Sequence, residues 1–162
     1  MAQPLIAGPR SRGKQRLAEA GGKRVQQEDN VHGLHQTDSF ALRNPNFLRY
    51  LQSHFAGARE ERFHATYCDD RGHYLHDEVL VCGTSGSVGT RARLVFGRAL
   101  ALGASGLMLA HNHPSGRCRP SSDDLLATNR MRDIAAALDI VLLDHLILTP
   151  DEIYSMRLGG CL

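Results

Sequence analysis

The run GLMLA at 106–110 restricts the fold of this chain more than any other feature of its sequence. A short run with no polar alternation is typical of a strand that is buried on both faces. IVLLDHLIL at 140–148 is a second run of this kind, and a long helical pattern separates the two. This order predicts an α/β fold, in which functional sites gather at the carboxyl ends of strands. His111 follows such an end directly.

The segments before this run extend the α/β pattern. RFHATYC at 62–68 alternates apolar and polar residues as a strand does, and HYLHDEVLVCG at 73–83 returns as a second strand after a turn. Glu78 lies within the return strand. A helix should begin after the Asn44-Pro45 break. Four apolar residues share one face of it: Phe47, Leu48, Leu51 and Phe55.

The later segments alternate helix and strand. A loop rich in Gly and Ser is expected from 83 to 89, followed by a helix that Thr90 caps and Gly103 ends. A long helix should begin near Ser121, and the last strand is expected in DEIYSMR. The buried stripe predicted for the first of these helices consists of Ala92, Val95, Phe96 and Ala99.

Length and composition indicate one domain in a reducing compartment. A chain of 162 residues with 42% apolar residues can bury a sufficient core. No apolar stretch approaches the roughly 18–20 residues of a membrane span, and no secretory signal is visible, so we expect no membrane partner and a cytoplasmic location. Residues 1–44 are expected to form a disordered basic arm, and residues 45–162 the folded domain.

The four cysteines are dispersed and form no CxxC pair. In a reducing compartment they are expected to be free thiols that mostly pack as small hydrophobic side chains. They are Cys68, Cys82, Cys118 and Cys161.

His111, His113 and Asp124 form the pattern that carries chemistry. Two histidines two residues apart can point at one centre when the backbone is extended or turning. The loop between them and Asp124 contains Pro and Gly, and can bring the start of the next helix back to the strand end. Two imidazoles and one carboxylate are a ligand set that zinc accepts while keeping a fourth position for water.

Hydrolysis by water bound to zinc also needs a general base, and Glu78 is the candidate from the neighbouring strand. Ser121 could donate a hydrogen bond to the developing oxyanion. Structural interpretations stay open for the same residues. A histidine at a strand end is commonly structural, and Ser121-x-x-Asp124 also suits a helix N-terminus, where the serine caps and the carboxylate favours the positive end of the dipole.

The full spacing resembles a known family. His111-x-His113, seven residues and Ser121-x-x-Asp124, with a Glu upstream, resemble the JAMM (MPN+, or JAB) metalloprotease motif. Within that superfamily the sequence is most similar to the bacterial RadC-like group, named historically as DNA repair proteins. The likeness covers about residues 45–162 and rests on ERFHATYCDDRG (61–72), DEVLVCGT (77–84), RALALGASGLMLAHNHPSG (98–116), PSSDD (120–124) and DHLIL (144–148).

The resemblance implies a cytidine-deaminase-like fold, a three-layer α-β-α arrangement with a mixed central sheet. It implies Zn²⁺ held by His111, His113 and Asp124, with Glu78 as general acid and base and Ser121 as helper to the oxyanion. Such sites hydrolyse amide or isopeptide bonds, so the expected partner is a peptide or isopeptide substrate of unknown identity.

The sequence departs from that family in three places. Nothing before residue 45 resembles the helix-hairpin-helix module of longer relatives, which weakens a role on DNA. Ala92-Arg93-Leu94 stands where relatives usually carry Pro-Arg-Glu, and Arg117-Cys118-Arg119 stands where they carry Asp-Pro-Thr. The second change makes the site more basic and leaves open whether Cys118 is a fourth ligand, a redox switch or an unliganded loop residue. His145 is expected to support a ligand or the core, and Asp144 is equally open.

Two other functions compete with that of a zinc hydrolase. A nucleic-acid-associated accessory protein with a structural or vestigial zinc site is favoured by the basic arm and by the family's name, while the net charge of +2 and the complete ligand set argue against it. A nucleobase deaminase would need HxE and PCxxC motifs, and neither is present.

Overall fold

The computed structural model describes residues 44–81 and 88–162, and in this part of the chain five strands form one mixed sheet. The strand order is β2-β1-β3-β4-β5, in which β3 and β4 are parallel and the other neighbouring pairs are antiparallel. The strands are β1 (Arg62–Cys68), β2 (Tyr74–Val81), β3 (Gly106–Asn112), β4 (Val141–Leu148) and β5 (Ile153–Ser155).

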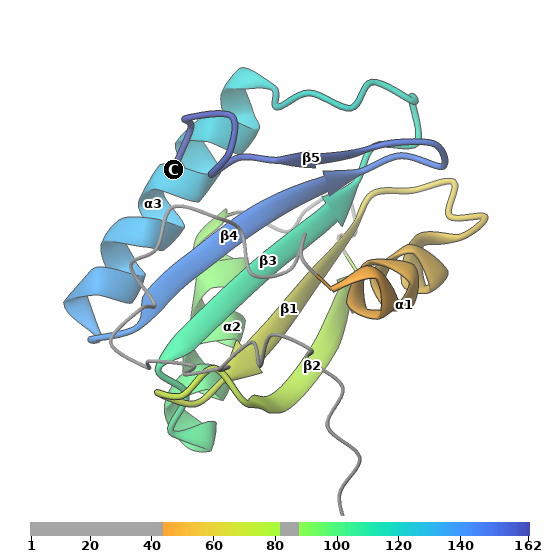
Figure 1. The fold of residues 1–162 in the computed structure, drawn as a ribbon. Coiled ribbons are helices and arrows are strands. Elements are labelled where there is room, and N and C mark those ends of the chain that lie inside the picture. Colours follow the sequence, from red (N-terminus) through yellow and green to blue (C-terminus); the bar gives the residue numbers. More distant parts are fainter. Residues whose placement is uncertain (1–43, 82–87) are drawn as a thin grey trace, which may run out of the picture.

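Helices cover both faces of the sheet (Figure 1). α1 (Pro45–Phe55) packs on one face, while α2 (Val88–Leu102) and α3 (Ser122–Ala137) pack on the other. The larger apolar cluster joins α2 and α3 to the sheet, and the smaller joins α1 to the opposite face of β3 and β4. The prediction of an α/β fold with a mixed central sheet between helical layers is confirmed.

Helix ends follow the local chemistry of the sequence. Asn44 caps α1 because its side-chain Oδ1 accepts hydrogen bonds from the backbone N–H groups of Asn46 and Phe47, at 3.0 and 3.2 Å. Gly103 ends α2 with a φ of 63°, a conformation that glycine adopts without steric cost. The predicted stripe on α2 is buried in all four positions.

The start of α2 differs from the prediction. The helix already includes Val88, so Thr90 lies in its first turn and is not its cap. Val and Gly are weak helix formers, which is why the pattern favoured a later start. Residues 1–43 of the predicted arm and residues 82–87 of the predicted loop lie outside the described residues. Among the helices described, none is long and apolar enough to cross a membrane.

Candidate metal centre

The three predicted ligands meet where β3 ends and α3 begins. His111 is the penultimate residue of β3, and the backbone N–H of His113 still donates to the carbonyl of Leu148 in β4, at 2.9 Å. Asp124 lies in the first turn of α3. One donor atom from each of His111, His113 and Asp124 lies within 4.8 Å of the other two. The structure therefore brings these three residues together.

The separations between donor atoms suit a tetrahedral metal. Nε2 of His111 lies 2.9 Å from Nε2 of His113 and 3.2 Å from Oδ1 of Asp124, and His113 Nε2 lies 3.4 Å from Oδ2 of Asp124. Ligands at zinc distances of 2.0–2.1 Å with tetrahedral angles lie about 3.3 Å apart. The group needs only small shifts to bind one ion.

The backbone fixes the proton on His113. Its Nδ1 lies 2.8 Å from the carbonyl oxygen of Arg117, which can only accept a hydrogen bond. Nδ1 therefore carries the proton and donates, and the lone pair of Nε2 faces the centre. This is the tautomer that a metal-binding histidine requires.

A buried relay fixes the proton on His111 in the same way. Thr128 donates from Oγ1 to the carbonyl oxygen of Asp124 at 2.6 Å, so its hydroxyl must accept from Nδ1 of His145, also at 2.6 Å. Complete burial holds the pKa of His145 well below its ordinary value, so this ring is neutral and its Nε2 is an acceptor. Nδ1 of His111 donates to it at 2.9 Å, which leaves the lone pair of His111 Nε2 for a metal.

Asp124 is held as a carboxylate although it is half-buried. Burial alone would raise its pKa, but the polar contact with His111 and the hydrogen bonds from the side chain and backbone of Ser121 outweigh burial and hold the pKa well below its ordinary value. Ser121 donates from Oγ to Oδ2 of Asp124 at 2.6 Å and accepts from its backbone N–H at 3.1 Å. These contacts complete a capping box, so Ser121 caps α3 and also supports the predicted ligand.

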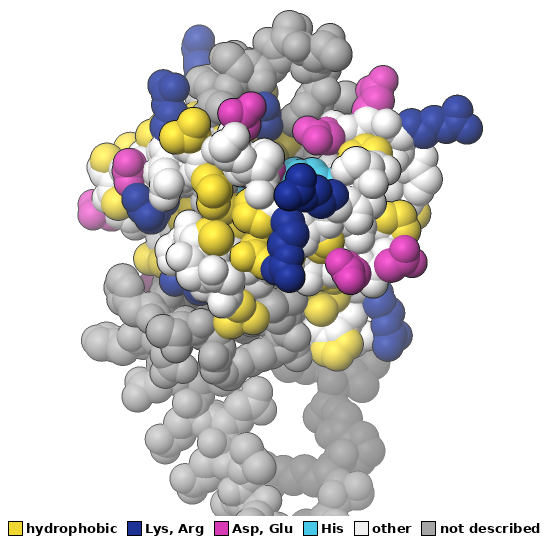
Figure 2. Space-filling view, turned by 90° about the horizontal axis from the view of Figure 1, so that it is seen from above, with side chains coloured by type: hydrophobic (Ala, Val, Ile, Leu, Met, Phe, Trp, Pro, Cys, Tyr) yellow, Lys and Arg dark blue, Asp and Glu magenta, His cyan; other side chains and the backbone are white. Residues whose placement is uncertain are grey.

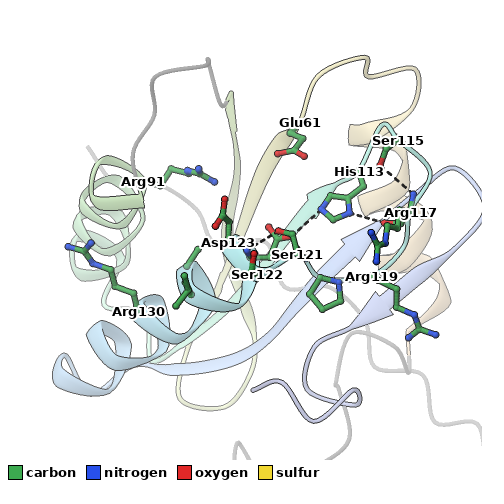
Figure 3. A pocket seen from close by; sticks show the side chains of 14 residues that line it. Glu61, Arg91, His113, Ser115, Arg117, Arg119, Ser121, Ser122, Asp123 and Arg130 are labelled. Carbon is green, nitrogen blue, oxygen red and sulfur yellow. Dashed lines mark hydrogen bonds and ion pairs between the residues drawn. The ribbon is translucent and has the colours of Figure 1, made fainter.

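An open cavity of about 980 Å³ lies beside this group. Figure 2 shows histidine partly covered by basic side chains on the face seen from above, with acidic side chains nearby. Figure 3 shows Arg91 and Arg130 on one side of His113 and Ser121, and Arg117 and Arg119 on the other. The charged lining residues are Arg91, Arg117, Arg119 and Arg130, with Glu61, Asp123 and Asp124. A bound divalent cation would give this cavity a clear positive charge.

Glu61 is a lining carboxylate that no sequence motif indicated. It lines the open cavity beside Asp124, and with His111 and Asp124 it also lines an inner cavity of about 30 Å³, large enough for a water molecule. Asn112 fixes the backbone on both sides of Glu61: its Oδ1 accepts from the N–H of Arg62 at 2.7 Å, and its Nδ2 donates to the carbonyl of Glu60 at 3.2 Å. A possible signal was its place before β1, two residues from the position that pairs with His111.

Glu78 is not brought together with these residues. It lies on β2 opposite Ala65, where its Oε1 accepts a hydrogen bond from the hydroxyl of Tyr67 at 2.7 Å and its Oε2 lies 3.8 Å from Nε of Arg98. It lines neither of the two cavities described above. The geometry gives no support to its predicted role as general base.

Cys118 and Asp144, whose roles the sequence left open, take structural positions. Cys118 is buried and donates from its thiol to the carbonyl of Ile147 at 3.4 Å; burial raises the pKa of this thiol, and it is outside the metal-binding group. Asp144 is completely buried. It accepts hydrogen bonds from the backbone N–H groups of His145 and Arg157, at 2.7 and 3.1 Å, and from the hydroxyl of Ser155 at 2.5 Å.

Fold and site together define an α/β domain with a candidate metal centre at the carboxyl end of an inner strand. The chain belongs to the family of RadC-like JAB domains, whose model matches residues 42–161. It is 35% identical over 130 residues to a UPF0758 protein of Escherichia coli strain K12, with 80% of this chain and 79% of that protein covered.

Two other relatives, also named UPF0758 protein, show the same level of similarity. The one from Vibrio atlanticus is 37% identical over 121 residues, which cover 74% of this chain and 54% of the relative. The one from Paraburkholderia phytofirmans is 36% identical over 111 residues, which cover 68% and 43%. The chain thus spans about half the length of these two longer relatives.

Proposed function

We propose that this chain is a zinc-dependent hydrolase that cleaves amide or isopeptide bonds. The observation that carries the proposal is the group of His111, His113 and Asp124, whose two imidazole lone pairs and ionised carboxylate face one point beside an open cavity. When bound there, zinc would activate water and polarise the substrate carbonyl. The metal analysis will also detect any other ion with similar ligand preferences at this site.

For the general base, the geometry favours Glu61 over Glu78. Glu61 shares the inner cavity with His111 and Asp124, so its carboxylate can accept a proton from an attacking water and return it to the leaving nitrogen. Glu78 instead accepts a hydrogen bond from the hydroxyl of Tyr67 and lies near Arg98. Ser121 faces the cavity, and its hydroxyl can stabilise the oxyanion once it turns from Asp124 towards the substrate.

The experiment combines zinc content with hydrolysis. The purified full-length chain and its His113→Ala variant are analysed for zinc, and wild type is screened by mass spectrometry against mixed peptides and isopeptide-linked peptides. We expect about one zinc per chain to be lost with His113→Ala, along with hydrolysis. A well-folded wild type that retains no zinc at this group would reject the hydrolase.

A matched pair of variants assigns the base. Glu61→Gln should retain zinc and lose nearly all turnover, a loss of about 10²–10⁴-fold for a general base. Glu78→Gln should retain both, apart from a modest loss of stability through Tyr67. If Glu78→Gln abolishes turnover while Glu61→Gln stays active, the assignment of the base to Glu61 is wrong.

A nucleic-acid-associated accessory protein is the second candidate, because four arginines line the cavity. Arginine binds phosphate as readily as carboxylate. Binding of a DNA or RNA oligonucleotide that weakens steeply with salt and survives zinc removal would favour this candidate. Loss of oligonucleotide binding when Arg117 and Arg119 are replaced by alanine would locate the contact in the cavity.

A further inference from the structure

A second group of two histidines and one aspartate lies on the opposite face of the sheet. His54 belongs to the last turn of α1, His64 to β1 and Asp77 to β2, so three elements contribute one side chain each. One donor atom of each lies within 4.8 Å of the other two, the same criterion that the His111 group meets. Figure 1 shows α1 packed against the part of the sheet that these two strands form.

The donor distances and the supporting contacts resemble those of a metal site. His64 Nε2 lies 3.0 Å from Oδ2 of Asp77, close to the roughly 3.3 Å between neighbouring ligands of a tetrahedral zinc. The hydroxyl of Tyr50 donates to the same oxygen at 2.7 Å, and the hydroxyl of Tyr74 donates to Oδ1. Ligating carboxylates are commonly held by such contacts. Asp77 is therefore oriented before any ion binds.

His64 can present a lone pair to an ion without changing its surroundings. Its Nδ1 lies 3.4 Å from the hydroxyl oxygen of Thr66, which can accept a hydrogen bond. When Nε2 of His64 binds a metal, the ring proton moves to Nδ1, and Thr66 becomes its partner. His64 is completely buried, so the ring cannot turn to solvent instead.

The unpaired buried nitrogen of His54 is separate evidence that this group binds a ligand. The Nε2 of His54 is buried and has no hydrogen-bond partner among the described residues, although its ring centroid lies only 5.1 Å from that of His64. Buried polar atoms are almost always paired, because an unpaired one loses its hydration without compensation. The pair of His64 and Asp77 is satisfied without His54, so it does not explain why a histidine stands at position 54.

We propose that His54, His64 and Asp77 form a second metal site, which takes one divalent cation of the zinc type and ties α1 to β1 and β2. Zinc accepts two imidazoles and a carboxylate, with water in the fourth position. The backbone carbonyl of His54 accepts from Nη1 of Arg62 at 3.1 Å, which helps to fix the helix end that carries this ligand. The site is independent of the hydrolase proposal because it faces α1, whereas His111 faces α3.

Zinc stoichiometry of the full-length chain tests the site. The protein is stripped with a chelator, reloaded with excess zinc, desalted and analysed for metal. We expect about two zinc ions per chain in wild type and about one in His54→Phe, whose ring fills the same space without a buried nitrogen. His73→Phe is the matched control, since exposed His73 pairs with Asp69 but has no third ligand among the described residues, and it should leave the count unchanged.

A His113→Ala background separates the two sites. There we expect about one zinc per chain and a rise of Tm when zinc is added, and both should disappear when His54→Phe is added. Asp77→Asn should likewise remove one zinc from wild type. Equal zinc content in wild type and His54→Phe would overturn the second site. A wild type that holds one zinc, lost in His54→Phe and kept in His113→Ala, would confirm the second site and reject the first.

Discussion

Replacing Thr128 by valine tests whether buried hydrogen bonds set the tautomer of His111. Thr128 is completely buried, and its hydroxyl makes two bonds of 2.6 Å, donating to the carbonyl of Asp124 and accepting from Nδ1 of His145. Valine keeps the shape of the side chain and removes only the hydroxyl. His145 then has a buried N–H without its partner, whereas the Asp124 carbonyl keeps its helical hydrogen bond.

The expected cost follows from that unpaired N–H. Leaving one buried donor unsatisfied destabilises a protein by about 1–3 kcal/mol. His145 can avoid part of this cost by moving its proton to Nε2, but that nitrogen faces Nδ1 of His111. His111 must then carry its own proton on Nε2, where it blocks the metal. We therefore expect the metal-free Thr128→Val protein to lose stability and zinc affinity to fall about 10–100-fold.

Two measurements on one set of proteins check this reasoning. Urea unfolding of the metal-free chain gives the stability change, and competition with a chromophoric chelator gives zinc affinity. Thr128→Ser is the control because it keeps the hydroxyl, and it should preserve most of the zinc affinity. If Thr128→Val binds zinc as tightly as wild type, the tautomer argument is refuted, whatever its stability.

Three further changes probe the fold. Burial lowers the folded-state pKa of His145 and His64 below the ordinary 6.5, so the unfolded chain takes up protons first as the pH falls. The stability of the metal-free protein, followed by urea unfolding, should therefore be full above about pH 7. Below about pH 6.5 it should fall by up to about 1.4 kcal/mol per pH unit for each histidine. Asp144→Ala leaves several buried donors unpaired and should lower the free energy of unfolding by about 3 kcal/mol or more in the same assay. A decrease of less than about 1 kcal/mol would contradict the structural role of Asp144 as their acceptor. Gly106→Ala places a Cβ against Sγ of Cys68, so it should destabilise by about 1–3 kcal/mol, part of which Cys68→Ala should restore in a double-mutant cycle.

The sequence predicted the elements well where one local rule decides them. The apolar run at 106–110 lies in β3, and all but the first residue of the run at 140–148 lies in β4. The break at Asn44-Pro45 starts α1. These elements were predictable because burial and capping are read from neighbouring residues. The spacing from His111 to Asp124 also brought these residues into one group, since a short loop joins the strand end to the helix start.

The choice between two carboxylates was beyond the same reasoning. Glu61 stands just before the first strand and Glu78 lies within the second, and only the pairing of β1 with its two neighbours shows which one reaches the cavity. The role of Thr128 could not be predicted from the sequence for a related reason. One threonine in a helix has no motif, and its role depends on His145, which lies on a strand later in the chain.

Asn112 explains how one end of β3 can position residues on two sides of the cavity. The β1–β3 ladder pairs Phe63 with His111, and at the next step the side chain of Asn112 takes over from the backbone by accepting from the N–H of Arg62. The backbone N–H of His113 continues the ladder with β4 by donating to the carbonyl of Leu148, which holds the second histidine beside the cavity. Because the same amide also holds Glu60, Glu61 is fixed between two anchored neighbours. A slip of β1 by one residue would turn Glu61 to the other face of the sheet, and the two hydrogen bonds of Asn112 oppose such a slip at the end of the ladder where Glu61 lies.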